Sequence, residues 1–233
     1  MRTIGLIGGM SWESSAEYYR LINEDVKQRL GGLHSAQSIL HTVDFAVIER
    51  MQHEGRWDAA GLLLADAARG LERAGAACIV LCTNTMHKMA DVIAAAVSIP
   101  FMHIAEPTAA AIRARDIRRI GLLGTRFTME ESFYRGYLEQ RFTLDVLVPD
   151  AEQRAIVNRV IYEELCLGLV RDESRAHYRA IMQHLVERGA EGIILGCTEI
   201  TLLLSADDSA VPLFDTTRLH ASAAVDFALG GFL

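Results

Sequence analysis

The chain has 233 residues, of which 51% are hydrophobic and 23% are charged, and its formal net charge is −7. This composition is sufficient for one or two buried cores and excludes an intrinsically disordered chain. The negative charge leaves no basic surface to hold nucleic acid or an anionic membrane, so we expect neither as a partner.

Short runs rich in leucine and β-branched residues alternate with helical segments along the whole chain. The alternation predicts an α/β fold with mainly parallel, buried strands. In chain order, we expect strands at Thr3–Ile7, Ser38–Val43, Cys78–Cys82, Phe101–Ile104, Arg119–Leu123, Leu144–Val148, Gly192–Leu195 and Leu213–Asp215. The hydrophobic periodicity predicts long helices at Glu13–Arg29, Trp57–Ala74, Glu152–Gly168 and Ser174–Arg188.

The longest apolar runs have the length of strands and are too short to cross a membrane. The first expected strand starts at residue 3, so we expect no signal peptide. Four cysteines without an export signal indicate reduced thiols, and we expect a cytoplasmic protein.

Three segments occur twice in the same order at nearly equal intervals. Residues 3–8 resemble 119–124, residues 78–85 resemble 192–199, and residues 99–101 resemble 211–213. We therefore expect two pseudo-symmetric α/β lobes, one over residues 1–115 and one over residues 116–215. A C-terminal helix at about 216–233 is expected to pack back on the first lobe.

The repeat also predicts where a ligand binds, because open α/β sheets bind ligands outside the carboxyl ends of their strands. Each lobe ends an equivalent strand there, followed by Thr83 in the first lobe and Cys197 in the second. If the lobes face each other, these two residues flank one cleft, which becomes the active site. Such a pair suits a reaction that removes a proton from one face of a carbon and returns one to the other.

Cys197 is the residue in the repeat best suited to proton transfer. It follows a buried strand and opens a segment that reads as a helix, where the helix dipole is expected to lower the thiol pKa below about 8.5. A thiolate is then a competent base. In the first lobe, Asn84 and Thr85 follow Thr83, and with Thr198 they can bind an ammonium and a carboxylate.

These motifs resemble the aspartate/glutamate racemase family, and in particular its enterobacterial aspartate/glutamate-specific or broad-specificity subgroup. The resemblance is carried by residues 5–10, 81–87, 122–125, 161–163 and above all by Gly196 to Glu199. It implies a homodimer, an active site between two lobes, a two-base mechanism, and no pyridoxal phosphate, metal or other cofactor. It also places Met10, Thr125, Thr128 and Glu199 among the substrate-binding residues.

Two positions depart from the family pattern. Thr83 stands where the family has its first catalytic cysteine, whereas Cys82 lies one residue earlier and is expected to point into the sheet packing. A threonine hydroxyl is a much weaker acid than a thiol, so we expect Cys197 to abstract the α-proton and Thr83, with water, to reprotonate the other face. In related glutamate racemases the second cysteine serves the L-enantiomer, which implies activity mainly on L-substrates and a poor reverse direction.

The second departure concerns the distal carboxylate of the substrate. The alignment places Gln52 at a family arginine and Cys166 at a family lysine, so a charged clamp is replaced by neutral groups. Selectivity for aspartate and glutamate is then looser, and a broad-specificity racemase of neutral amino acids such as homoserine is an alternative. A decarboxylase or isomerase of the same superfamily that needs one cysteine, or a binding protein without catalysis, also stays open.

Three other interpretations have weaker support. The glycine turn at residues 5–10 lacks the spacing of a dinucleotide-binding loop. Cys78 and Cys82 lie in one apolar strand without a second pair, which disfavours zinc. A cysteine hydrolase needs a histidine partner for Cys197, for which His87, His103 and His220 are candidates, but the sequence has no nucleophile-elbow spacing.

Overall fold

The computed structural model describes residues 1–230, and its contacts divide the chain into two compact units. The first unit holds residues 1–104 and the segment that starts at His220, and the second unit holds residues 105–219. Each unit contains one four-stranded sheet in which all paired strands are parallel. The predicted fold class, two α/β lobes with mainly parallel sheets, is confirmed.

The sheet of the first unit has the strand order β2-β1-β3-β4. Its strands are β1 (Ile4–Gly8), β2 (Ser38–Thr42), β3 (Cys78–Leu81) and β4 (Phe101–Met102). Its helices are α1 (Trp12–Leu30), α2 (Phe45–His53), α3 (Trp57–Arg73), the 3₁₀ helix η1 (Thr85–Met89) and α4 (Ala90–Ala94).

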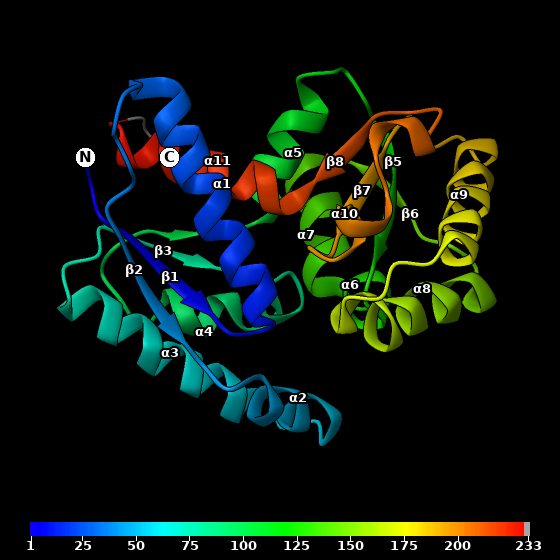
Figure 1. The fold of residues 1–233 in the computed structure, drawn as a ribbon. Helices are drawn as coiled ribbons and strands as arrows, with labels where there is room; N and C mark the ends of the chain where they lie inside the picture. Colours follow the sequence, from blue (N-terminus) through cyan, green and yellow to red (C-terminus); the bar gives the residue numbers. More distant parts are fainter. Residues whose placement is uncertain (231–233) are drawn as a thin grey trace. The chain divides into compact units, whose positions relative to one another are not determined.

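Alternate residues of β3 enter two cores on opposite faces of this sheet. Cys78 and Val80 pack with α1 and with the last part of α11 (Thr216–Ala228), whereas Ile79 and Leu81 pack with α3. Figure 1 shows α1 and this part of α11 close together, and Arg29 of α1 donates a hydrogen bond to Ser222 Oγ at 2.9 Å. Burial on both faces explains why the strand reads as an unbroken apolar run.

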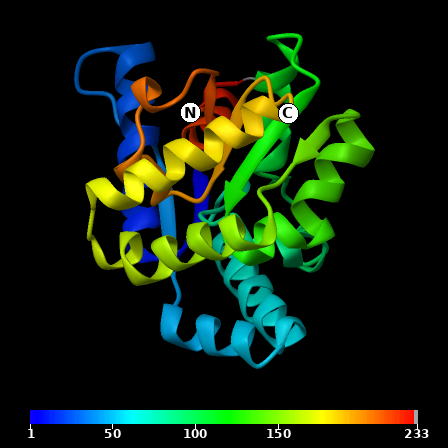
Figure 2. The same ribbon diagram turned by 90° about the vertical axis from the view of Figure 1, so that its right-hand side faces the viewer.

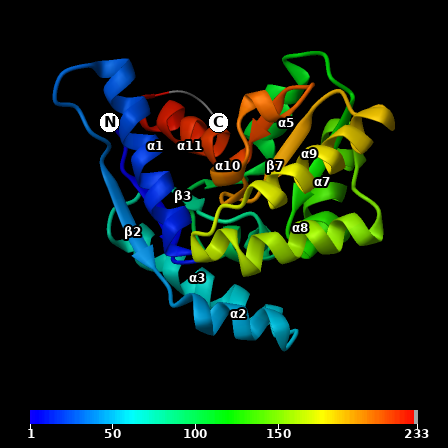
Figure 3. The ribbon, with the colours of Figure 1, turned by 45° about the vertical axis from the view of Figure 1, so that its right-hand side comes forward.

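The sheet of the second unit has the order β6-β5-β7-β8, which repeats the order of the first sheet element by element. Its strands are β5 (Arg119–Gly124), β6 (Asp145–Leu147), β7 (Ile193–Gly196) and β8 (Leu213–Asp215). Its helices are α5 (Ala105–Arg113), α6 (Arg126–Glu130), α7 (Ser132–Phe142), α8 (Ala151–Glu163), η2 (Leu165–Leu167), α9 (Asp172–Glu187), α10 (Ile200–Leu203) and η3 (Ala206–Asp208). Figures 2 and 3 show α8 and α9 side by side, in agreement with their contacts.

Two boundaries differ from the sequence expectation. Residues 105–115 group with the second unit, because α5 packs against α7 and β8 and because Tyr137 donates a hydrogen bond to Glu106 at 2.8 Å. The helix expected over Glu152–Gly168 ends at Glu163, since Glu164 leaves the helical conformation and its carboxylate accepts a hydrogen bond from Ser174 at 2.6 Å. Residues 231–233 of the expected C-terminal helix lie outside the described residues.

Candidate active site

In the first unit, the expected site residues follow the carboxyl ends of two neighbouring strands. β1 and β3 pair with Ile7 opposite Leu81, so the segments after them meet at one edge of the sheet. The turn after β1 requires glycine at position 9, where φ is +95° and a Cβ would lie 2.1 Å from the carbonyl oxygen of Val43. This turn carries Met10, which is buried.

Thr83 lies half-buried just beyond β3, with its peptide held on both sides. Its N–H donates to the Leu81 carbonyl at 2.9 Å, and its own carbonyl accepts from His87 Nδ1 at 2.7 Å. Within residues 1–230, the Thr83 hydroxyl itself makes no hydrogen bond. Asn84 and Thr85 follow at the start of η1, and both are buried. The backbone of this segment is thus fixed while the hydroxyl of Thr83 stays available.

Gln52 lies near the end of α2 and is 5% exposed. Its Nε2 donates to Met86 Sδ at 3.0 Å, whereas its Oε1 has no hydrogen-bond partner in the described part of the chain. α2 therefore brings a neutral amide beside the segment that carries Thr83. The function of Gln52 in binding the distal group of a substrate stays a prediction.

The second unit places its site residues in the equivalent position. β5 and β7 pair with Gly124 opposite Gly196, so Thr125 and Cys197 follow adjacent strand ends. Thr125 caps α6, and its Oγ1 lies 3.2 Å from Oγ1 of Thr128. Thr128 is fully buried, and its methyl group would lie 3.4 Å from a Cβ at Gly196. The two threonines thus lie next to the end of β7, the strand that precedes Cys197.

The environment of Cys197 corrects the expected direction of its pKa. Residues 197–199 form a turn, and α10 begins only at Ile200 and has four residues, so little helix dipole acts on the thiol. Cys197 Sγ donates a hydrogen bond to Glu199 Oε2 at 2.8 Å. Burial, followed by the negative charge of Glu199 and the proximity of Cys166, raises the pKa of Cys197 well above its ordinary value. The prediction of a lowered pKa was wrong, and Cys197 is a neutral thiol next to a carboxylate.

The other cysteines differ from Cys197 in their surroundings. Cys82 is fully buried on the α1 face of the first sheet, and burial raises its thiol pKa, as expected for a packing residue. Cys78 shares this core, and burial raises its pKa to about 12. Cys166 lies half-buried in η2, which packs against α10. Cys166 is therefore a neighbour of Cys197 in the second unit.

Thr198 and the histidines have partners within their own units. Thr198 Oγ1 lies 3.2 Å from Thr217 Oγ1. His87 and His220 belong to the first unit and bind groups there, whereas the thiol of Cys197 donates to a carboxylate. This pairing gives no support to a cysteine–histidine hydrolase. Sequence reasoning missed the hydrogen bond from His87 to Thr83, although the spacing of four residues was a signal for it.

Residues 1–230 contain neither a metal-binding cluster nor a membrane-spanning helix. No group of three or more histidine, cysteine, aspartate or glutamate side chains is arranged to hold a metal ion. No helix in this range combines the length and the apolarity that crossing a bilayer needs.

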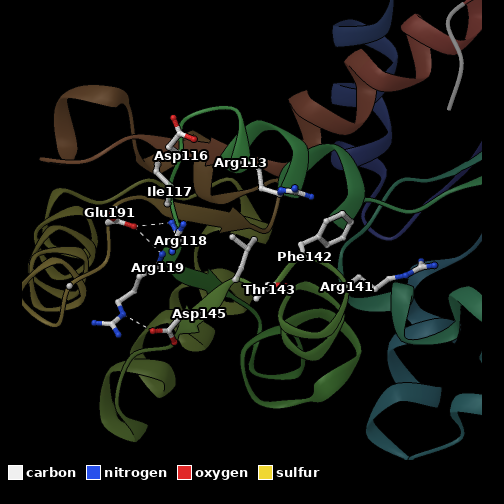
Figure 4. A pocket seen from close by; sticks show the side chains of 12 residues that line it. Arg113, Asp116, Ile117, Arg118, Arg119, Arg141, Phe142, Thr143, Asp145 and Glu191 are labelled. Carbon is white, nitrogen blue, oxygen red and sulfur yellow. Dashed lines mark hydrogen bonds and ion pairs between the residues drawn. The ribbon is translucent and has the colours of Figure 1, made fainter.

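A cavity of about 1010 Å³ opens at the opposite, amino-terminal edge of the second sheet. Figure 4 shows two of its charged groups with partners: Arg119 forms an ion pair with Asp145, and the Glu191 carboxylate accepts the backbone N–H groups of Arg118 and Arg119. The cavity lies at the start of β5 and β6, whereas Cys197 follows the end of β7, so the cavity is separate from the candidate site.

Comparison with known proteins assigns the family. The model of the Asp/Glu/hydantoin racemase family matches residues 7–224. A broad-specificity amino-acid racemase of Bacillus subtilis is 28% identical over 69% of this chain and 68% of its own length. Among solved structures, a candidate Asp/Glu racemase from Yersinia pestis is 56% identical, with TM-score 0.94 and coverage of 98% of this chain and 100% of the other. An aspartate racemase homologue from Pyrococcus horikoshii is 33% identical, with TM-score 0.86 and the same coverage.

The sequence motifs, the doubled α/β fold and these matches agree with one another. The resemblance to racemases inferred from the sequence is confirmed, and so is the prediction of an isomerase. The chain belongs to the Asp/Glu/hydantoin racemase family.

Proposed function

We propose that the protein is a cofactor-independent racemase of aspartate and glutamate, with Cys197 and Thr83 as the acid/base pair at the α-carbon. The observation that carries the proposal is the hydrogen bond of 2.8 Å from Cys197 Sγ to Glu199 Oε2. At the equivalent strand end of the other repeat, the hydroxyl of Thr83 has no partner within residues 1–230. The proposal requires the two strand ends to flank one substrate.

In this mechanism Glu199 acts on the thiol instead of only lining the pocket. Cys197 first transfers its proton to Glu199, and the resulting thiolate removes the α-proton of the L-enantiomer. The electron pair stays on the α-carbon, and Thr83 Oγ1 donates a proton to the opposite face. Water then reprotonates Thr83, and the hydroxide that forms takes the proton back from Glu199, while the thiol of Cys197 retains the former α-proton. The net change is inversion at one carbon with exchange of one proton. Asn84, Thr85 and Thr198 hold the ammonium and the α-carboxylate, with Met10, Thr125 and Thr128 around them.

Thermodynamics limits how the kinetic constants of the L-to-D and D-to-L conversions can differ. Because two enantiomers have equal free energy, the equilibrium constant is one, and kcat/KM must be the same from either side. A preference for the L-enantiomer can therefore take only one form, a higher kcat with the L-substrate that is matched by a proportionally higher KM. This is the form in which we propose a preference for L-enantiomers.

A broad-specificity racemase of neutral amino acids is the second candidate. It is favoured by Gln52, whose buried amide offers neutral hydrogen bonds where an arginine would form a charged bidentate pair. The relative from Bacillus subtilis is itself a broad-specificity amino-acid racemase. A panel that compares L-aspartate, L-glutamate and L-homoserine separates the two candidates by their kcat/KM values.

The test of the proposed function is racemisation in heavy water without added cofactor. L-aspartate or L-glutamate is expected to yield the D-enantiomer with deuterium at the α-carbon. Cys197→Ser is expected to lower the rate by roughly 10²–10⁴-fold, the usual contribution of a positioned acid/base group. The substrate should still raise the melting temperature of this variant, because binding groups are retained.

Other outcomes of this experiment contradict the proposal. Racemisation at an unchanged rate in Cys197→Ser would remove Cys197 from the mechanism. Binding without exchange in the wild type would indicate a binding protein. Loss of carbon dioxide from a malonate, or isomerisation of a maleate, would indicate a related reaction that uses one cysteine.

We also propose a cytoplasmic homodimer. The dimer is carried over from the family resemblance. None of the four cysteines forms a disulfide within residues 1–230, which supports a reducing compartment. Sedimentation across a range of protein concentrations tests the dimer, and fractionation of cells tests the compartment.

A further inference from the structure

The pairing of β3 with β4 stops before the strands reach the candidate site. The paired residues are Ile79 with Phe101 and Val80 with Met102. Beyond them, the ring of His87 links the two chain segments. Its Nδ1 lies 2.7 Å from the Thr83 carbonyl oxygen, and the N–H of Ile104 donates to its Nε2 at 3.1 Å. An imidazole thus continues the connection where the backbone hydrogen bonds end.

The partners of His87 determine its protonation state. A backbone N–H can only donate, so Nε2 of His87 must be the acceptor for Ile104. A carbonyl oxygen can only accept, so Nδ1 must carry the hydrogen that binds Thr83. The ring is therefore neutral and in the Nδ1–H form. Burial, and next the neighbouring His103 and His220, lower the pKa of His87 well below its ordinary value, which preserves this neutral form at physiological pH.

Other aromatic rings fix the position of His87, which is 2% exposed. The rings of His103, Phe101 and His220 have centroids 4.8, 5.5 and 5.8 Å from it. His220 is itself held between the Tyr18 hydroxyl at 2.8 Å and the Met102 carbonyl at 2.9 Å. A ring so enclosed has little freedom, so it can transmit a defined position to the Thr83 peptide.

We propose that His87 is a positioning residue for Thr83, which sets the approach of the hydroxyl to the α-carbon through the hydrogen bond to the Thr83 carbonyl. This inference rests on the proposed function of Thr83 as proton donor. His87 then governs the reprotonation step and leaves abstraction by Cys197 unchanged. Small misplacements of a reacting group lower rates by up to about 10²-fold.

Two substitutions separate the two hydrogen bonds of His87. The amide of His87→Asn occupies the place of Nδ1 and can still donate to the Thr83 carbonyl. The amide of His87→Gln reaches the place of Nε2, so it can accept from Ile104 but does not reach Thr83. Tyr18→Phe is the matched control, since it removes a hydrogen bond to His220 in the same buried cluster without a contact to Thr83.

Kinetic isotope effects on the conversion of L- to D-substrate identify the affected step. In His87→Gln we expect kcat to fall on the order of tenfold. The isotope effect of α-deuterated substrate should fall towards one, because abstraction becomes a reversible step before slow reprotonation. The solvent isotope effect should rise, because the proton from Thr83 is then transferred in the slow step. His87→Asn and Tyr18→Phe should keep both isotope effects of the wild type.

The proposal is overturned if His87→Gln shows the wild-type isotope effects, or if His87→Asn and His87→Gln change them equally. A test that needs no variant is ¹⁵N NMR of histidine-labelled wild-type protein. The Nδ1–H form of His87 supports the bond to Thr83, whereas the Nε2–H form excludes it, also if the variants do not fold. Absence of racemisation in the wild type would refute the proposed function, and the NMR result would still decide the hydrogen bonds of His87.

Discussion

The candidate base, Cys197, is a neutral thiol in the structure. In the second unit, burial and the Glu199 carboxylate both oppose ionisation of Cys197, and both raise its pKa. The same carboxylate is 2.8 Å from the sulfur and can take its proton. A residue that makes the thiolate rarer at rest is thus also the group that can form it when substrate is bound.

Glu199→Gln separates these two effects of the carboxylate. Removing its charge lowers the Cys197 pKa, so alkylation of the thiol by iodoacetamide at a given pH should become faster. Racemisation should become slower, roughly 10- to 100-fold, because the proton acceptor is lost. Mass spectrometry of the peptide with Cys197 measures the first rate apart from that of Cys166. Two rates that fall together would contradict this role of Glu199.

Thr83→Cys tests the other member of the pair. Threonine and cysteine have nearly the same size, so the substitution changes the acidity at this position much more than the packing. Because both directions share their transition states, a thiol in place of the hydroxyl should raise kcat with the D-substrate as well as with the L-substrate, by roughly 10- to 100-fold. Initial rates at saturating D-aspartate or D-glutamate measure the change. No gain in a folded variant would show that acidity at position 83 does not limit the reverse direction.

At the scale of the elements, the positions of the strand ends were predictable from the sequence, whereas the local structure that follows these ends was not. The apolar runs of β1, β3, β5 and β7 and their repetition placed Thr83 and Cys197 after equivalent strands. The expected helix at Cys197 failed because a strand followed by polar residues does not reveal that only four residues of α10 are helical. The two hydrogen bonds of His87 could not be predicted from the sequence, because its partners are backbone groups of Thr83 and Ile104. These groups come close to His87 only because the pairing of β3 with β4 stops before it reaches them.

The buried histidines of the first unit make stability depend on pH. Burial lowers the pKa of His220 from 6.5 to about 4, and His87 shifts in the same direction. Between these values the unfolded chain binds more protons than the folded one, so the free energy of unfolding falls as pH decreases below about 6.5. Each histidine contributes a slope of at most about 1.4 kcal/mol per pH unit.

Urea denaturation at a series of pH values measures this slope. His220→Gln should reduce it by about the contribution of one proton, because glutamine does not titrate. His34→Gln, at an exposed histidine, is the control substitution. An identical slope in the wild type and in His220→Gln would contradict a neutral, buried His220.

At the scale of the whole molecule, the sequence predicted two repeated lobes, and each sheet reproduces the other in strand order. The boundary near residue 115 was less predictable, because the affiliation of α5 depends on its packing with α7 and β8 and not on its own composition. Equal strand orders need not give equal chemistry. The repeats carry a hydroxyl at one strand end and a thiol–carboxylate pair at the other, so the two acid/base groups of the proposed reaction are unequal.

This asymmetry makes the central claim measurable with the unmodified enzyme. The decisive measurement is the pair of kcat and KM values for the L- and D-enantiomers of aspartate or glutamate, determined without cofactor from initial rates in each direction. We predict a clearly higher kcat and a proportionally higher KM for the L-enantiomer, with equal kcat/KM. Equal kcat values from the two enantiomers would contradict the proposed preference for L-enantiomers.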